Sequence, residues 1–235
     1  GDDDYRHESQ IGTHQESLVV EMAGNHLNAN FSRVHVSQDF VLAVKADGSL
    51  FLWGADPRDP NGSVSNQATA ISLDGVQVTL SNVGVADDGL CVGRTCYGRI
   101  GNRDFGAQGE AAIGQNIPAN EMTVVCGAKH CCGNGATGHA YCWGSNEYGQ
   151  LSSSRRTSFS QGVTILQLAL GSNHSCVLDN HANRYVHCVG DNQYYQLSER
   201  NNRERNDGWY VVGENANSPL NQTQSIFSGA DHMCL

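Results

Sequence analysis

Nine cysteines and ten histidines are the residues of this chain that could carry chemistry. Thiolates and imidazoles can bind zinc, whereas thiols in an oxidising compartment pair as disulfides. A zinc site could draw on five clustered residues: Cys126, His130, Cys131, Cys132 and Cys142. Structural zinc sites show two short paired spacings such as Cys-x-x-Cys, and this cluster lacks that pattern. We therefore expect disulfides and no metal centre.

Four Asn-x-Ser/Thr sequons accompany the cysteines, and their asparagines are Asn30, Asn61, Asn173 and Asn221. A single sequon is weak evidence, because chance produces one about every hundred residues. Sequons together with many cysteines nevertheless favour an oxidising compartment. The sequence thus predicts a secreted or cell-surface glycoprotein.

Two further patterns could indicate a cofactor or an ion. Residues 133–138 (GNGATG) match G-x-G-x-x-G, but dinucleotide binding needs a helix after the loop, and a strand pattern follows here. Asp2-Asp3-Asp4 and Asp87-Asp88-Gly89 could offer carboxylates to calcium, but calcium loops place oxygen ligands at several alternating positions. Asp-Gly is also ordinary hairpin-turn chemistry. We expect no cofactor, and without a G-x-S-x-G or H-E-x-x-H motif we expect no enzyme.

Charge and hydropathy exclude two classes of partner. The net charge is −10, whereas a nucleic-acid groove needs clustered lysine and arginine. No apolar run approaches the roughly 18 residues that a membrane span requires. The chain opens on Gly1 without an initiator methionine or a signal peptide, which is typical of a mature or excised piece of a longer protein.

Two motifs recur along the chain and account for where the cysteines lie. The first, x-Cys-Trp/Val-Gly-x-Asn followed by Gln-Leu-Ser, occurs at 141–152 and 187–198, with weaker copies at 90–101 and 52–56. The second, Gly-x-x-His, occurs at 126–133, 170–178 and 228–235, with degenerate copies at 36–42 and 80–85. The anchor glycines of the first motif are Gly1, Gly54, Gly93, Gly144 and Gly190, at steps of 39 to 53 residues by subtraction.

A period near fifty residues with Gly-rich turns indicates one small β-sheet per repeat, arranged around an axis. Residues 41–44 and 163–170 have the composition of buried strands, and 49–53 follow a hairpin turn at Ala46-Asp47-Gly48. No segment has a convincing helical stripe. We predict an all-β protein, a β-propeller of about five repeats. It forms a single domain or a portion of one over residues 1–235, with one blade split between the N- and C-terminal ends.

The paired motifs resemble the regulator of chromosome condensation repeat. That family forms β-propellers, commonly of seven blades, so the resemblance implies one four-stranded blade per repeat. It covers nearly the whole chain, strongly around Gly144 and Gly190 and weakly in the first two repeats. With about five repeats, the chain is expected to be part of a longer propeller or a compact five-bladed ring.

The repeat frame places two pairs of cysteines on adjacent strands of one hairpin and predicts the disulfides Cys132–Cys142 and Cys176–Cys188. Cys91–Cys96 is a candidate third pair, because Gly84 stands where the hairpin partner would lie. Cys126 and Cys131 are then left to each other or to a neighbouring blade. Cys234 is the odd cysteine, and it is expected to bond either a segment beyond Leu235 or another molecule.

We expect a non-enzymatic propeller that acts as a protein-interaction or structural module, through a protein partner or self-assembly. Insertions at 56–69, 102–121 and 199–218 should line one rim. Trp209 is a candidate contact residue, with loop packing as the alternative. The resemblance also implies a second function, guanine-nucleotide exchange on a small GTPase. Enzyme inhibition and glycan binding by the rim remain further alternatives.

Overall fold

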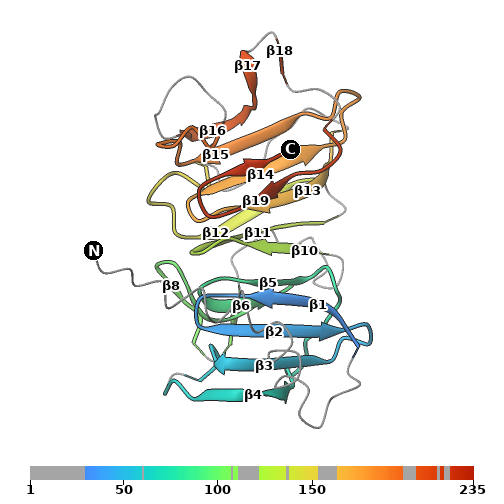
Figure 1. The fold of residues 1–235 in the computed structure, drawn as a ribbon, viewed down its shortest axis with the longest axis vertical. Coiled ribbons are helices and arrows are strands. Elements are labelled where there is room, and N and C mark those ends of the chain that lie inside the picture. Colours follow the sequence, from blue (N-terminus) through green and yellow to red (C-terminus); the bar gives the residue numbers. More distant parts are fainter. Residues whose placement is uncertain are drawn as a thin grey trace, which may run out of the picture.

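The computed structural model describes residues 30–59, 61–106, 108–110, 122–135, 138–152, 163–197, 205–215, 218–219 and 223–235. Within these ranges all regular structure is β-strand, which confirms the all-β prediction. The strands form small antiparallel sheets that extend away from a common centre (Figure 1). We call each sheet a blade and number the blades in chain order.

Blade 1 contains β1 (Phe31–Val36), β2 (Phe40–Lys45), β3 (Leu50–Ala55) and β4 (Val64–Ile71). Blade 2 contains β5 (Val83–Val85), β6 (Asp88–Val92), β7 (Thr95–Ile100) and β8 (Arg103–Asp104), and β9 (Gly109–Glu110) also pairs with β7. Blade 3 contains β10 (Thr123–Cys126), β11 (His130–Asn134) and β12 (Ala140–Gly144).

Blade 4 contains β13 (Ile165–Leu170), β14 (His174–Asp179), β15 (Val186–Gly190) and β16 (Arg205–Val211). A separate hairpin follows it, made of β17 (Gly213–Asn215) and β18 (Ser218–Pro219). The described part of blade 5 contains β19 (Phe227–Ser228) and β20 (Met233–Cys234). Gly1 and Asp2-Asp3-Asp4, which the sequence assigned to a split blade, lie outside the described residues.

The first strand of each blade lies nearest the centre. These strands contact one another in the order β1, β5, β10, β13 and β19, so the blades succeed one another around a common axis. Later strands lie progressively farther out, downward from β1 to β4 and upward from β13 to β16 in Figure 1. This arrangement is that of a β-propeller.

The hydrophobic core lies between neighbouring blades. Leu42 and Leu52 of blade 1 pack with Val83 and Leu90 of blade 2, and all four are almost fully buried. Burial of one such side chain contributes about 1.5–3 kcal/mol. The outermost strand β4, by contrast, is polar and largely exposed. Each repeat therefore depends on its neighbours for most of its buried apolar surface.

The structure corrects the alignment of the second repeat. The anchor glycine of its third strand, β7, is Gly98, which pairs with Gly89 as Gly144 pairs with His130. Gly93 lies instead in the turn that follows β6. The turn between its first two strands begins at Ala86, so residues 80–85 are not that turn. Both motifs of this repeat lie five residues later than the sequence pattern indicates, because Leu90-Cys91-Val92-Gly93 imitates the Cys-Trp-Gly pattern. With Gly98 in place, the steps from Gly54 through Gly144 to Gly190 are 44, 46 and 46 residues by subtraction.

In the part of the chain that the structure describes, no helix has the length and apolar character needed to cross a membrane.

Candidate functional site

Five equivalent turns meet at one end of the propeller axis. Each turn joins the first strand of a blade to its second strand, and its first residue donates a backbone hydrogen bond to the carbonyl three residues later. The donor–acceptor pairs are Ser37–Phe40, Ala86–Gly89, Gly127–His130, Gly171–His174 and Gly229–His232, at 2.8–2.9 Å. Between the turns lies a hollow of about 280 Å³, lined by residues 36–37, 85–87, 126–128, 170–172 and 228–230.

The Gly-x-x-His motif has a packing reason at these turns. A Cβ on Gly171 would clash with the ring of His174 and would come within 2.7 Å of the Gly229 carbonyl oxygen of the next blade. The same relation holds for Gly127, with His130 and the Gly171 carbonyl. The glycines therefore let the histidine ring and the neighbouring blade approach closely.

One of these histidines links two blades. The His130 Nε2 atom lies 2.8 Å from the Ser175 hydroxyl of blade 4, which in turn donates to the Gln150 carbonyl at 2.9 Å. Because the hydroxyl has a single proton, His130 must donate from Nε2, and its Nδ1 is buried without a partner among the described residues. Burial, and then the charge of His174, lowers the pKa of His130 to about 3. The ring is therefore a neutral structural donor.

His174 lacks the corresponding link to blade 5. Met233 follows His232 where Ser175 follows His174, so no hydroxyl is available. Both ring nitrogens of His174 are buried without a hydrogen-bond partner among the described residues. Burial lowers the pKa of His174 to about 4, although the charges of Asp231 and Asp191 oppose this shift.

The end of each third strand returns to the same turns. Gly54, Gly98, Gly144 and Gly190 all have positive φ, and a Cβ at Gly144 would come within 2.6 Å of the Lys129 carbonyl oxygen. The residue after the glycine donates to that turn in three blades: Ala55 to Asp39, Ser145 to Lys129 and Asp191 to Asn173, each at 2.9 Å. The loops after the third strands therefore share one face with the hollow, and we call this the hollow face.

The hollow face is predominantly acidic. The carboxylates in its described turns and loops that form no ion pair with a described residue are Asp39, Asp59, Asp87, Asp88, Glu147, Asp191 and Asp231. The cations there are Arg58, Arg103 and Lys129. Asp56 is partly neutralised by Arg58, whose Nη2 lies 2.6 Å from Oδ2. Of the five turns, all of which the structure describes, only the one at Lys129 carries a lysine or arginine. Burial and then the charge of Asp88 raise the pKa of Asp87, which lines the hollow.

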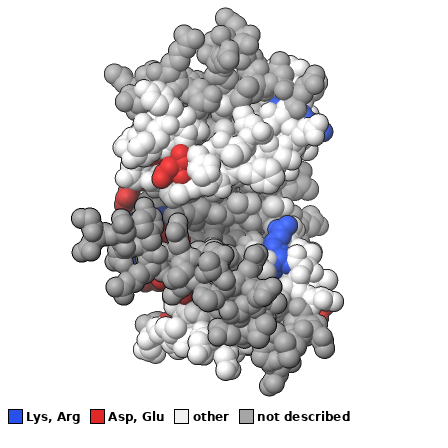
Figure 2. Space-filling model, in the orientation of Figure 1, with Lys and Arg blue, Asp and Glu red and all other residues white. Residues whose placement is uncertain are grey.

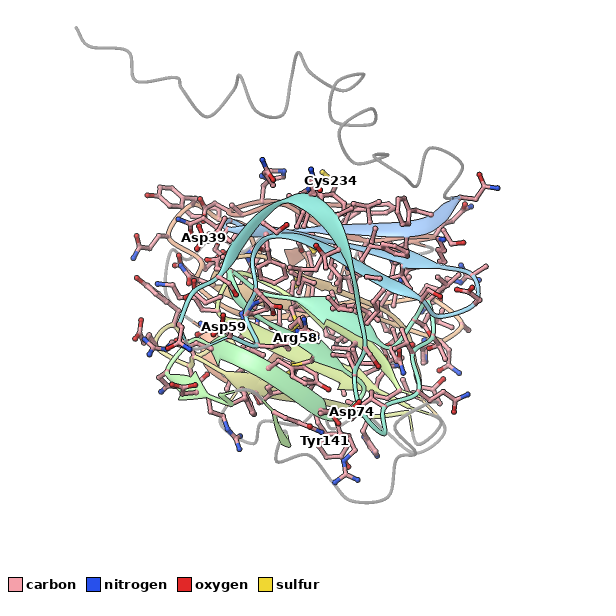
Figure 3. The ribbon with its side chains drawn as sticks, turned by 90° about the horizontal axis from the view of Figure 1, so that it is seen from below. Asp39, Arg58, Asp59, Asp74, Tyr141 and Cys234 are labelled. Atoms are coloured by element: carbon pink, nitrogen blue, oxygen red, sulfur yellow. A yellow bond between two sulfur atoms is a disulfide. The ribbon has the colours of Figure 1, made fainter. Side chains whose placement is uncertain are left out.

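The opposite face has a different charge. The described turns between second and third strands, with the last residue of each second strand, carry three cations, Lys45, Arg94 and Arg184, and two carboxylates, Asp47 and Asp179. In Figure 2 the most prominent acidic patch lies toward the left and the most prominent basic patch toward the right. Figure 3 shows Asp39 and Asp59 toward the left, away from Asp74 and Tyr141 at the lower side.

Disulfides fix the strands that carry this face. Within the described residues four join directly opposed positions of neighbouring strands: Cys91–Cys96, Cys126–Cys131, Cys132–Cys142 and Cys176–Cys188. The structure thus brings together the two pairs that the repeat frame predicted and the candidate third pair, Cys91–Cys96. It pairs Cys126 with Cys131 within blade 3. Such short loops stabilise by about 2–3 kcal/mol each. Cys234 is an exposed free thiol on β20.

The other expected residues lie in varied settings. Asn30 and Asn61 are exposed, Asn173 is half-buried on the hollow face, and Asn221 lies outside the described residues. Trp209 is half-buried in β16 and packs against the core cluster between blades 3 and 4. Parts of the three expected insertions form outer strands, notably β4 and β16, so they contribute to the blades as well as to the rim.

Sequence reasoning missed two exposed aromatic residues on the hollow face. Tyr194 and Tyr195 follow the third strand of blade 4 and are 70% and 54% exposed. The signal was present in the repeat alignment, because Tyr195 stands where the preceding repeat has Gly149.

The fold has close counterparts among solved structures. Human WBSCR16 superimposes with a TM-score of 0.65 at 15% identity, over 88% of this chain and 57% of that chain. A structure of Kap60 bound to yeast RCC1 (Prp20) gives 0.62 at 13% identity, over 86% and 52%. Prp20p from Saccharomyces cerevisiae, described with its binding to Gsp1p and histones, gives 0.59 at 13% identity, over 86% and 54%. The chain therefore spans a little more than half of the length of these structures.

The sequence itself matches the model of the regulator of chromosome condensation (RCC1) repeat at residues 123–150 and 165–196. These two segments coincide with blades 3 and 4, which carry the complete Gly-x-x-His and Asn-x-x-x-Gln-Leu motifs. Blades 3 and 4 thus match the RCC1 repeat, and the chain folds as an RCC1-like β-propeller.

Proposed function

We propose that this protein is a secreted or cell-surface interaction module that binds a protein partner through the hollow face and catalyses no reaction. The observation that carries the proposal is the construction of that face. Five hydrogen-bonded turns surround a hollow, three of them are hydrogen-bonded to the ends of third strands, and disulfides fix the strands of blades 2, 3 and 4. A rigid scaffold that presents variable loops is the usual architecture of a binding surface.

The cysteines support a secreted or cell-surface location. Eight of the nine form disulfides within single blades, and such bonds persist in oxidising environments. The exposed sequons at Asn30 and Asn61 offer accessible sites for N-glycans. At Asn173 the sequon hydroxyl, Ser175, is fully buried, so glycosylation there would have to precede folding.

The compartment is tested by non-reducing peptide mapping of protein from its native source, with and without deglycosylation. We expect the four disulfide-linked peptides and glycans on Asn30 or Asn61. Nine free thiols and bare asparagines would contradict secretion. That result would favour guanine-nucleotide exchange on a small GTPase, which the fold likeness to Prp20 supports.

The binding surface is tested by photo-crosslinking of the full chain in fluid from the native compartment. A photo-reactive residue at the position of Gln38 probes the hollow face, and one at Asp74 probes the opposite side. We expect a crosslinked protein from the Gln38 position only. Equal crosslinking from both positions, or none from Gln38, would contradict the assignment of this face.

A further inference from the structure

The loops after the third strands of blades 3 and 4 share one hydrogen-bond scheme. Asn146 Oδ1 accepts from the Leu151 N–H at 2.8 Å, and Asn192 Oδ1 accepts from Leu197 at 2.9 Å. The Gln150 side chain likewise accepts from Tyr148 N–H, as Gln196 does from Tyr194, both at 2.9 Å. The two loops can therefore be compared residue by residue.

The comparison isolates Tyr195. In blade 3 the equivalent residue is Gly149, with φ of 75°, and Tyr195 adopts the same left-handed conformation with φ of 60°. A residue with a Cβ is disfavoured there, whereas glycine is not. The loop thus keeps a large side chain at a position whose backbone favours glycine. Backbone strain of this kind clusters at ligand-binding and switch sites.

Packing is not the role of the Tyr195 side chain. Tyr194 and Tyr195 are adjacent and 70% and 54% exposed, whereas Tyr148, the counterpart of Tyr194, is half-buried. Tyrosine is enriched among the residues that dominate protein interfaces, because it offers a large rigid apolar ring and a polar tip.

The charge around Tyr194 and Tyr195 indicates the chemistry of the partner. The tyrosine loop is tied to the hollow by the Asp191–Asn173 hydrogen bond, and Ser172 in turn donates to Ala230 of blade 5 at 2.8 Å. The adjoining turn carries Asp231, which is exposed, and the hollow wall carries Asp87 with its raised pKa. The carboxyl of Asp87 is repelled by Asp88 and Asp39 and attracted by Lys129. A further cation from a partner would complement the charges of Asp87 and Asp231.

We infer that Tyr194 and Tyr195, together with the acidic rim of the hollow, bind a basic segment of a protein partner through its lysine or arginine side chains. The rings receive the cation through cation–π contacts, and the carboxylates complement its charge. This inference rests on the proposed function and specifies the chemistry of the partner.

The test measures binding of a short fluorescein-labelled peptide of alternating Arg and Ser to the full disulfide-bonded chain, by fluorescence anisotropy. We expect binding that weakens as salt is added, and none of a Glu–Ser peptide. Tyr195→Gly introduces the residue found at the equivalent position of blade 3, Gly149, so the variant should fold at least as well as the wild type. It should nevertheless bind the peptide about tenfold more weakly. Wild-type affinity in Tyr195→Gly would overturn the inference.

The charge contribution has a matched control. Asp231→Asn removes a carboxylate from the hollow face, and Asp74→Asn removes one from the loop that follows β4 on the opposite side. Weaker binding by Asp231→Asn alone supports the inference. Equal weakening by both variants would show that the peptide responds only to the net charge of the protein, and this would refute the inference. Binding of neutral oligosaccharides in place of the Arg–Ser peptide would also overturn it, in favour of a glycan site. A protein crosslinked from Gln38 but no peptide binding would leave the proposed function intact and reject only this partner chemistry.

Discussion

Removal of the Ser175 hydroxyl should weaken the interaction between blade 3 and blade 4 and so lower the free energy of unfolding. The hydroxyl is fully buried, accepts from His130 Nε2 at 2.8 Å and donates to the Gln150 carbonyl at 2.9 Å. Ser175→Ala leaves both groups buried and unpaired, and each such group costs about 1–3 kcal/mol. We expect the free energy of unfolding to fall by about 3 kcal/mol. Ser172→Ala, at a half-buried serine of the hollow, should change it by no more than about 0.5 kcal/mol.

The assay is urea unfolding near pH 7 under non-reducing conditions, followed by tryptophan fluorescence. A double-mutant cycle with His130→Leu isolates the contact, and we expect a coupling free energy of about 1–2 kcal/mol. The m-value should stay unchanged, because the variants alter stability and not the surface exposed on unfolding. Strict additivity of His130→Leu and Ser175→Ala, or a Ser175→Ala cost no larger than that of Ser172→Ala, would refute the blade-to-blade link.

Three further predictions follow from single residues. The pKa of His130 is about 3 in the folded protein, against an ordinary 6.5, so the unfolded chain binds more protons between these two pH values. The free energy of unfolding should therefore be highest above pH 6.5 and fall by several kcal/mol on acidification toward pH 3. Urea midpoints measured across this pH range test the prediction. Gly190→Ala should lower the free energy of unfolding by more than about 2 kcal/mol, because its Cβ would clash with the Asn173 carbonyl. Gly62→Ala, with open space around the new Cβ, should lower it by only about 1 kcal/mol. Similar melting temperatures for the two variants would contradict the close contact between Gly190 and Asn173. Tyr195→Gly should raise the free energy of unfolding or leave it unchanged, and a clear loss in the same urea assay would show that the ring has a structural role.

The sequence was most informative where the repeat was complete. The motifs around Gly144 and Gly190 placed the strands of blades 3 and 4, because turn chemistry and the Gly-x-x-His pattern both repeat there. In blade 2 the histidine is absent and Gly89 stands in its place. A chance Cys-Val-Gly at residues 91–93 then imitated the anchor, and the alignment shifted by five residues. A count of strand length between turns would have favoured Gly98, since it restores an almost constant step.

The candidate site was harder to predict from the sequence. The hollow is lined largely by backbone and small side chains, and its position depends on five turns that are far apart in the chain. The expected contact residue, Trp209, lies in β16 and packs its ring against the hydrophobic core. Tyr195, by contrast, belongs to no local sequence motif. Its significance appears only when two loops with the same hydrogen bonds are compared.

The turns also explain how one repeat can serve both fold and recognition. In the turns of blades 3 and 4, backbone contacts with the next blade fix the first position, and packing under the turn fixes the fourth, as in Gly171 and His174. The third position faces no such constraint, and in chain order it holds Asp39, Asp88, Lys129, Asn173 and Asp231. The charge of the hollow face can therefore change without loss of the propeller. Partner specificity should accordingly follow the third position of the turns, and Lys129→Asp should strengthen binding of a basic peptide while the free energy of unfolding changes by no more than about 0.5 kcal/mol.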